Sequence, residues 1–251
     1  MSQEAIPWIV GFSLLGSVGA IAGAASFLLF PKEIRDRLVP FLVSYATGAL
    51  LGAALLGLLP RAIEAGGVSM SLGVVLAGLL LFFVLERLLL WRHCHHEGPC
   101  DVHGAAGHLV LMGDALHNFV DGAVIAAAFM TSIPLGIATG VAVIAHEVPQ
   151  EVGDFAILLD NGFTPRRALV WNLVSGSTTI PGALLAYMGL QQLPQWTAVM
   201  LALSASSFLY IGLADLVPGL HQRIGPQTGV AQVGLILAGI GTIVLLRLAH
   251  G

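Results

Sequence analysis

Apolar residues run along this chain in long blocks, without the alternating or 3.6-residue spacing of half-buried strands and helices. A helix that crosses a membrane needs about 20 mainly apolar residues. Eight windows meet this requirement, at residues 8–30, 40–60, 70–91, 107–130, 134–159, 166–190, 196–217 and 229–248. The pattern therefore predicts an all-α integral membrane protein with eight transmembrane helices, forming a single domain over residues 1–251.

Proline and glycine mark the breaks between these windows. Pro31 and Pro40 are expected to bracket the first loop, and Gly66 and Gly67 fall in the second. Prolines also stand near the starts of four later windows, at Pro134, Pro165, Pro194 and Pro226. The breaks therefore support the division into eight helices.

The composition indicates a surface that faces lipid. Of the 251 residues, 57% are hydrophobic and only 10% are charged, whereas a soluble domain carries about 25% charged residues. The net charge of −4 offers no basic surface for nucleic acid. Only Glu4 and no positive residue precedes the first window, so we interpret that window as a retained spanning helix and not a signal peptide.

Basic residues are distributed unevenly between the loops. Eight lie in or beside the loops after the first, third, fifth and seventh windows: Lys32, Arg35, Arg37, Arg87, Arg92, Arg166, Arg167 and Arg223. Only Arg61 and Arg247 fall on the opposite side. Because loops rich in Lys and Arg stay in the cytoplasm, we expect a multi-pass protein of the plasma or inner membrane with both termini on the non-cytoplasmic side.

Acidic residues collect where basic residues are missing. Between His93 and Arg166 there is no Lys or Arg, but there are eight acids: Glu97, Asp101, Asp114, Asp121, Glu147, Glu151, Asp154 and Asp160. Several of them lie inside the predicted fourth and fifth helices. A carboxylate at membrane depth costs at least about 2.5–3.5 kcal/mol without compensation. Bound cations, protons or basic groups from other helices must therefore compensate these charges.

Helical spacing places these polar residues in two stripes. Asp114, His117, Asn118 and Asp121 share an arc of roughly 100° on the fourth helix. A turn at residues 131–133 joins this helix to the fifth, so the two helices should be antiparallel neighbours.

On the fifth helix, His146 and Gln150 stack on one face, with Glu147 and Glu151 beside them and Asp154 one turn further. Both stripes then lie at roughly one depth near mid-membrane. Two imidazoles, several carboxylates and two amides can meet there. This donor set suits zinc, iron(II), manganese or cadmium and lacks the thiolates expected for copper(I), although a proton relay would use the same residue types.

Two motifs carry a resemblance to a known family. Residues 117–122 read HNFVDG and residues 146–155 read HEVPQEVGDF, with further similarity at residues 48–52, 58–60 and 208–215. On these motifs the chain resembles the ZIP family of divalent metal transporters over nearly its whole length. It is most similar to the branch whose helices carry HNFxDG and HExPHExGDF.

The resemblance implies a ZIP-like helix bundle with a binuclear metal site between helices four and five. The first metal position is matched by His117, Asp121, His146 and Gln150, and the second by Asn118, Glu147 and Gln150; Glu151 matches a position beside the site. It also implies import of a divalent ion into the cytoplasm, with Zn²⁺ as the first candidate and Cd²⁺, Fe²⁺ and Mn²⁺ after it. Family members are often dimeric, so a homodimer is one expected assembly.

The chain departs from the family pattern at four positions. Gln150 stands where the branch usually has His, and Thr179 stands where some relatives place Glu. In the second helix, Ala53 and Gly57 replace the Asp and His that the branch tends to show. These departures are expected to weaken the second metal position and the selectivity for zinc.

Two further features leave alternatives open. A predicted cytoplasmic loop at residues 92–106 contains the His- and Cys-rich residues 93–103. Their composition is that of a metal-binding segment or, on the other interpretation, of a solvated polar loop.

Two other functions remain as alternatives to transport. The rival is an intramembrane metal-dependent hydrolase with Glu147 as general base, and the third is a metal sensor without flux. We expect a transporter that is not an enzyme.

Overall fold

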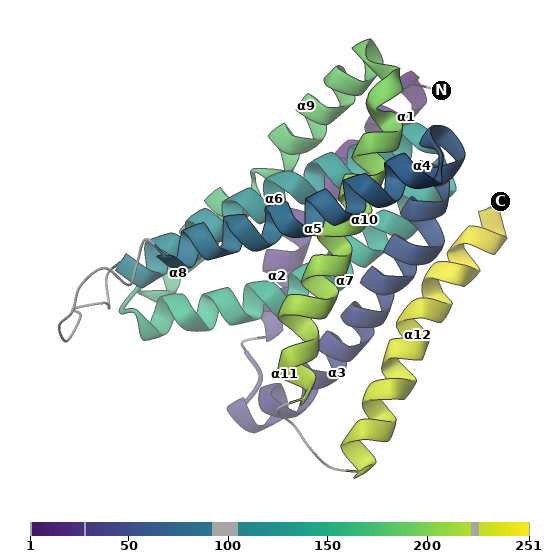
Figure 1. Ribbon diagram of the computed structural model, residues 1–251. Helices are drawn as coiled ribbons and strands as arrows, with labels where there is room; N and C mark the ends of the chain where they lie inside the picture. The colour runs from purple at the N-terminus through teal and green to yellow at the C-terminus, as the bar shows by residue number, and fades with distance from the viewer. Residues whose placement is uncertain (1, 28, 92–104, 222–225, 251) are drawn as a thin grey trace.

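The computed structural model describes residues 2–27, 29–91, 105–221 and 226–250, which form eight helical passes (Figure 1). The first pass is α1 (Ser2–Leu14), η1 (Leu15–Gly19) and α2 (Ala20–Phe27), and the second is α3 (Lys32–Gly52), η2 (Ala53–Leu58) and α4 (Leu59–Gly66). The next three are α5 (Val68–Trp91), α6 (Ala105–Thr131) and α7 (Ile133–Asp160). The sixth pass is α8 (Pro165–Gly176) and α9 (Thr179–Gln192). The seventh is η3 (Pro194–Trp196), α10 (Thr197–Tyr210), η4 (Ile211–Leu216) and α11 (Val217–His221), and the eighth is α12 (Pro226–His250).

The predicted all-α fold with eight helices is confirmed. Among the described residues, seven of the passes are long and apolar enough to cross a membrane. The remaining pass is α7, which carries Glu147, Glu151 and Asp154 within its length. The pass that lacks a sufficiently apolar window is thus the one that brings Glu147, Glu151 and Asp154 into the bundle.

Several predicted boundaries are wrong. The first helix begins at Ser2 and the second at Lys32, each well before its apolar window, because helices continue past the hydrocarbon core. Pro40 does not bracket a loop but lies inside α3. Membrane helices tolerate such prolines. The predicted loop at 92–106 also runs two residues into α6.

The proline and glycine signals at other breaks are confirmed. Gly67, between α4 and α5, has a φ of 82°, a backbone conformation that favours glycine. Prolines occupy the first or second residue of α7, α8 and η3, and Pro226 begins α12. Proline fits this position because its missing N–H has no partner in the first helical turn.

Glycine permits the closest helix contacts. A Cβ at Gly122 of α6 would collide with the Thr179 carbonyl of α9, and one at Gly182 of α9 would collide with the Phe119 carbonyl of α6. These two backbones therefore touch, as small residues allow in lipid. This contact fixes the face of α6 that carries the polar stripe.

Three segments have π-helical hydrogen bonding that the sequence pattern does not predict: η1, η2 and η4. Such segments often occur at functional sites in helices. Two of them coincide with positions of interest, since η2 contains Ala53 and Gly57, and η4 contains Asp215.

The α6–α7 hairpin lies at the centre of the bundle (Figure 1). Only Ser132 separates the two helices, and its hydroxyl accepts a hydrogen bond from the Leu135 N–H to cap α7. The predicted antiparallel arrangement is therefore confirmed. It brings the polar residues of both helices to the same depth.

Candidate metal centre

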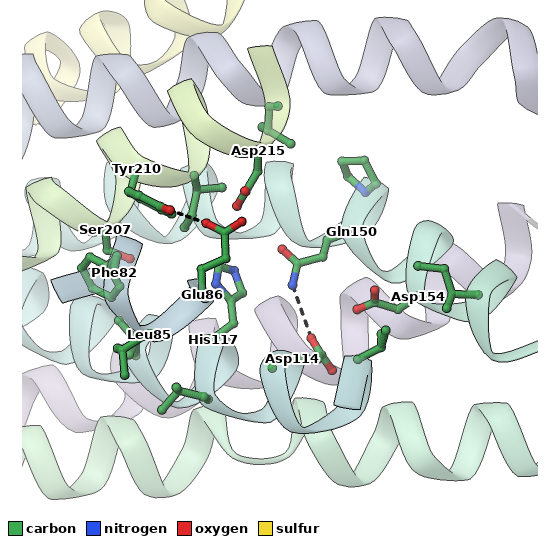
Figure 2. Close-up of a pocket in the computed structure, with 18 of the residues that line it drawn as sticks. Phe82, Leu85, Glu86, Asp114, His117, Gln150, Asp154, Ser207, Tyr210 and Asp215 are labelled. Carbon is green, nitrogen blue, oxygen red and sulfur yellow. Dashed lines mark hydrogen bonds between the residues drawn. The ribbon is translucent and has the colours of Figure 1, made fainter. Parts of the chain in front are cut away.

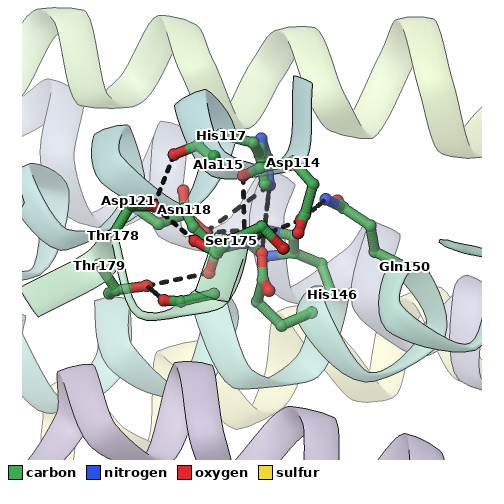
Figure 3. A network of polar contacts seen from close by, with 12 residues as sticks. Asp114, Ala115, His117, Asn118, Asp121, His146, Gln150, Ser175, Thr178 and Thr179 are labelled. Atoms are coloured by element: carbon green, nitrogen blue, oxygen red, sulfur yellow. Dashed lines mark hydrogen bonds and ion pairs between the residues drawn. The ribbon is translucent and has the colours of Figure 1, made fainter. Parts of the chain in front are cut away.

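Four side chains converge between α6 and α7: His117, Asp121, His146 and Glu147, which we call the His–acid cluster. Figure 3 shows three of them, His117, Asp121 and His146. The Nε2 atom of His146 lies 3.1 Å from Nε2 of His117 and 3.0 Å from Oδ2 of Asp121. Oε1 of Glu147 lies 3.3 Å from Nε2 of His117 and 3.5 Å from Nε2 of His146. One donor atom from each residue thus points at a common centre.

These distances suit one metal ion. In a tetrahedral site with metal–ligand bonds of roughly 2.1 Å, neighbouring donor atoms are roughly 3.4 Å apart. The five separations that involve an imidazole nitrogen run from 3.0 to 3.8 Å, and all four donor atoms lie within 4.8 Å of one another. Two imidazoles and two carboxylates form a donor set that zinc accepts.

Burial isolates the cluster from the surface. Asp121, His146 and Glu147 are fully buried, whereas the His117 side chain is 18% exposed. Among the described residues, neither oxygen of Asp121 nor of Glu147 accepts a hydrogen bond. Buried carboxylates that accept no hydrogen bond are costly, and the nearest groups to these two are the imidazoles of His117 and His146. A cation at the common centre would therefore compensate the charge of both carboxylates.

A backbone contact orients His146. Its Nδ1 atom lies 3.0 Å from the Ala142 carbonyl, one helical turn earlier. A proton on Nδ1 donates to that oxygen and leaves the Nε2 lone pair directed at the cluster. Such a hydrogen bond from the far ring nitrogen is the common way to orient a metal-binding histidine.

Asn118 and Gln150, the two amides of the predicted site, take part in a hydrogen-bond network around Asp114 (Figure 3). Asn118 donates to Oδ1 of Asp114 at 2.9 Å, and Gln150 donates to the same oxygen at 3.4 Å. Thr179 donates to the Asn118 side-chain oxygen at 2.9 Å. Both amides thus use their N–H groups to hold Asp114.

Three carboxylates form a second group beside the first: Asp114, Glu147 and Glu151, which we call the three-acid cluster. All three side chains are buried. Asp114 was absent from the ligands that the resemblance implied. The signal was present in the sequence, because Asp114 lies on the same arc of α6 as His117 and Asn118.

A cavity of about 630 Å³ reaches the site from one end of the bundle. Asp114, His117 and Gln150 line its inner part, and Asp154 lines it further along α7 (Figure 2). Ile157, one turn beyond Asp154, is also among the lining residues. This access cavity therefore extends towards the end of the bundle where α6 begins and α7 ends.

The other wall of the access cavity comes from α5, α10 and η4. There Tyr210 donates a hydrogen bond to Glu86, and Asp215 lies beside them (Figure 2). These acids were not among the predicted site residues, because nothing in sequence spacing relates α5 to α10. The predicted metal-binding tract at residues 93–103 lies outside the described residues.

The fold and the site thus define a multi-pass membrane protein with a buried imidazole–carboxylate cluster at the inner end of a cavity of about 630 Å³. The sequence profile of the family described as ZIP Zinc transporter matches residues 91–247. Zinc transporter ZIP13 from Pongo abelii is 34% identical, with 96% of this chain and 79% of that protein covered. The chain belongs to the ZIP zinc transporter family, and it is a transporter rather than an enzyme.

Other relatives are longer than this chain. Zinc transporter foi from Drosophila melanogaster is 37% identical over 62% of this chain but only 22% of its own length. Zinc transporter ZIP10 from Homo sapiens is 37% identical over 61% of this chain and 20% of its own length. The similarity to these two proteins therefore covers about three fifths of this chain and about a fifth of the length of each of them.

Proposed function

We propose that this protein carries a divalent cation, with Zn²⁺ as the preferred cargo, across the membrane through the His–acid cluster. The observation that carries the proposal is the convergence of four donor atoms from α6 and α7, all within 4.8 Å of one another. The other residues proposed for the site are Asn118, Gln150 and Glu151. Cd²⁺, Fe²⁺ and Mn²⁺ are further cargo candidates, because mixed imidazole and carboxylate donors also accept them.

Binding would replace the hydration shell of the ion with protein donors. The formal charge of the two carboxylates in the His–acid cluster matches that of a divalent cation, so the ion can leave water without an uncompensated charge. The access cavity then supplies a route between the cluster and one end of the bundle. Transport requires that the cluster becomes accessible from the opposite end in turn.

The direction of transport that we propose is into the cytoplasm. The access cavity extends towards the end of the bundle that carries the loops after the first, third, fifth and seventh passes, in or beside which eight of the ten Lys and Arg residues are found. By the positive-inside rule these loops are cytoplasmic, so both termini lie outside the cell membrane. In this arrangement the cavity is the release path, with its acidic residues along the way.

Three proposals concern the protein as a whole. Residues 1–251 act as one transport domain, since all eight passes pack into one bundle around the α6–α7 hairpin. The His- and Cys-rich residues 93–103 capture metal on the cytoplasmic side. Two copies assemble as a homodimer in the bilayer.

The test is uptake of Zn²⁺, Cd²⁺, Mn²⁺ and Fe²⁺ into proteoliposomes. Replacement of His117 or His146 by Ala removes a donor atom, and we expect each variant to lose at least about tenfold of the uptake, because even outer-shell changes at metal sites cost that much. His221→Ala is the matched control, since His221 is exposed at the end of α11. Wild-type protein that binds Zn²⁺ but moves none would disprove transport.

A further inference from the structure

A second cavity, with a volume of about 710 Å³, lies at the end of the bundle opposite to the access cavity. Its walls come from three parts of the chain that are distant in sequence: η2 with α4, the Ser132 turn with the first residues of α7, and the last two turns of α12. Figure 1 shows α4 and the C-terminal end of α12 at this same end of the bundle. The cavity therefore lies between passes that the membrane surrounds.

Two arginines from different helices bring positive charge to the second cavity. Arg61 lies in α4 and Arg247 in the last turn of α12, and both line the cavity. Arg61 is paired through one nitrogen with Glu64 at 2.9 Å, but a guanidinium group has five N–H donors, so further donors remain. In the part of the chain that is described, no carboxylate pairs with Arg247, and no acid lines the cavity. The cavity thus keeps a net positive charge.

The rest of the wall is mainly apolar and lies deeper in the membrane. Leu56 and Val244 line the cavity about one helical turn nearer to mid-membrane than Arg61 and Arg247 on the same helices. Leu56 is 39% exposed, so part of this wall faces lipid. The second and eighth passes are both apolar enough to span, and both end shortly after their arginine. The arginines therefore lie at the depth where the hydrocarbon core gives way to headgroups.

This profile matches that of a phospholipid. A phospholipid places its phosphate at headgroup depth and its acyl chains below, as the cavity places its arginines above its apolar wall. Guanidinium groups bind phosphate through paired hydrogen bonds. A single arginine at a helix end only reaches to the membrane surface. Two arginines from separate passes that line one cavity instead form a site, and its volume lies within the range of roughly 300–1,000 Å³ that small-molecule sites have.

We propose that the second cavity binds one anionic phospholipid from the adjoining leaflet, with its phosphate between Arg61 and Arg247 and its chains along Leu56 and Val244. Basic pockets between transmembrane helices bind anionic headgroups in this way. A zwitterionic headgroup would bring its own cation towards the two arginines, so the site prefers a lipid without one. The Ser132 hydroxyl accepts from the Leu135 N–H and keeps its own proton to donate to a phosphate oxygen.

The test measures which lipids stay on the purified full chain in native mass spectrometry. The probes are equimolar palmitoyl-oleoyl-phosphatidylglycerol and chain-deuterated palmitoyl-oleoyl-phosphatidylcholine. Wild-type protein should retain phosphatidylglycerol in excess. Arg61→Gln with Arg247→Gln should lower the ratio of the two bound lipids by about five- to thirtyfold, because each arginine near an anionic lipid contributes roughly a factor of five.

Two further variants separate the cavity from general effects of charge and folding. Arg166→Gln with Arg167→Gln removes the same charge from two exposed arginines that do not line the cavity, and it should keep the wild-type ratio. Val244→Trp fills the cavity but keeps both arginines, and it should also release phosphatidylglycerol. Retention of phosphatidylcholine at the wild-type amount shows that each variant is folded.

A soluble competitor distinguishes a lipid from a free anion. Glycerophosphoglycerol, the headgroup without its chains, should not displace phosphatidylglycerol at equal concentration, since it makes no contact with the apolar wall.

Three results would overturn the lipid site: equal retention of the two lipids by wild-type protein, equal losses in the two double-arginine variants, or displacement by glycerophosphoglycerol. The last result would identify an anion site without chain contacts. None of these measurements involves a metal ion, so the proposed cation transport stands or falls separately.

Discussion

The two halves of the bundle on either side of the His–acid cluster differ in kind. On the side where α6 begins, a cavity of about 630 Å³ lined by Asp154, Asp215 and Glu86 reaches the cluster. On the side of the Ser132 turn, buried apolar residues close the bundle: Leu58, Ile125, Phe129, Leu135 and Leu201. An acidic cavity reaches the cluster from one side, whereas a layer of buried apolar side chains closes it off on the other.

A second cavity reinforces this contrast. It has a volume of about 710 Å³ and lies at the closed end, where Arg61, Arg247 and Ser132 are among its lining residues. Positive charge at that mouth disfavours a cation, whereas the acids of the access cavity attract one. In this structure the His–acid cluster is therefore open to one end of the bundle and separated from the other end by an apolar barrier.

The largest expected effect is a difference in chemical accessibility. In a Cys94→Ser, Cys100→Ser background, which removes both native thiols, Leu216→Cys in the access cavity should react fully with a membrane-impermeant thiol reagent. Leu201→Cys, buried in the apolar half, should stay at background. Labelling of both positions at similar rates in metal-free protein would contradict the contrast between the halves.

A smaller effect is expected from the acids of the access cavity. Asp154→Asn with Asp215→Asn should lower cation uptake by about tenfold at low salt, because a negatively lined cleft raises the local cation concentration. The loss should shrink as ionic strength rises. Glu33→Gln, an exposed acid at the start of α3 and outside the cavity, serves as control in the same flux assay.

The smallest effect is expected at the basic mouth. Arg61→Gln with Arg247→Gln should raise uptake by up to about twofold, since charges near the surface are largely screened at physiological salt. Arg61 is in addition already paired with Glu64 at 2.9 Å. Arg166→Gln, at the other end of the bundle, is the control. A decrease in uptake on loss of Arg61 and Arg247 would contradict this prediction, because it would show that these two residues assist the cation.

The sequence predicts the hairpin site well because two local rules determine it. Helical periodicity places Asp114, His117 and Asp121 on one face, and the one-residue connection at Ser132 sets the depth of α7 against α6. From these rules the meeting of His117 with His146 follows without any knowledge of the other helices.

What the sequence could not predict depends on contacts between distant helices. The hydrogen bond from Tyr210 to Glu86 joins α10 to α5, and Thr179 reaches Asn118 from α9. The π-helical segments arise from packing that no apolar window reveals. Asp114 was predicted in part. Helical spacing places it on the polar face of α6, but its proximity to Glu147 and Glu151 is seen only in the structure.

The single-residue turn at Ser132 has a mechanical consequence. Ligands from α6 and α7 are tied to one hairpin too short to let its arms slide, and the contact of Gly122 with α9 fastens a third helix to it. A change of access must therefore leave this hairpin whole and displace the helices around it. The bound cation would stay in place on the hairpin, while the surrounding helices move so that the opposite side opens.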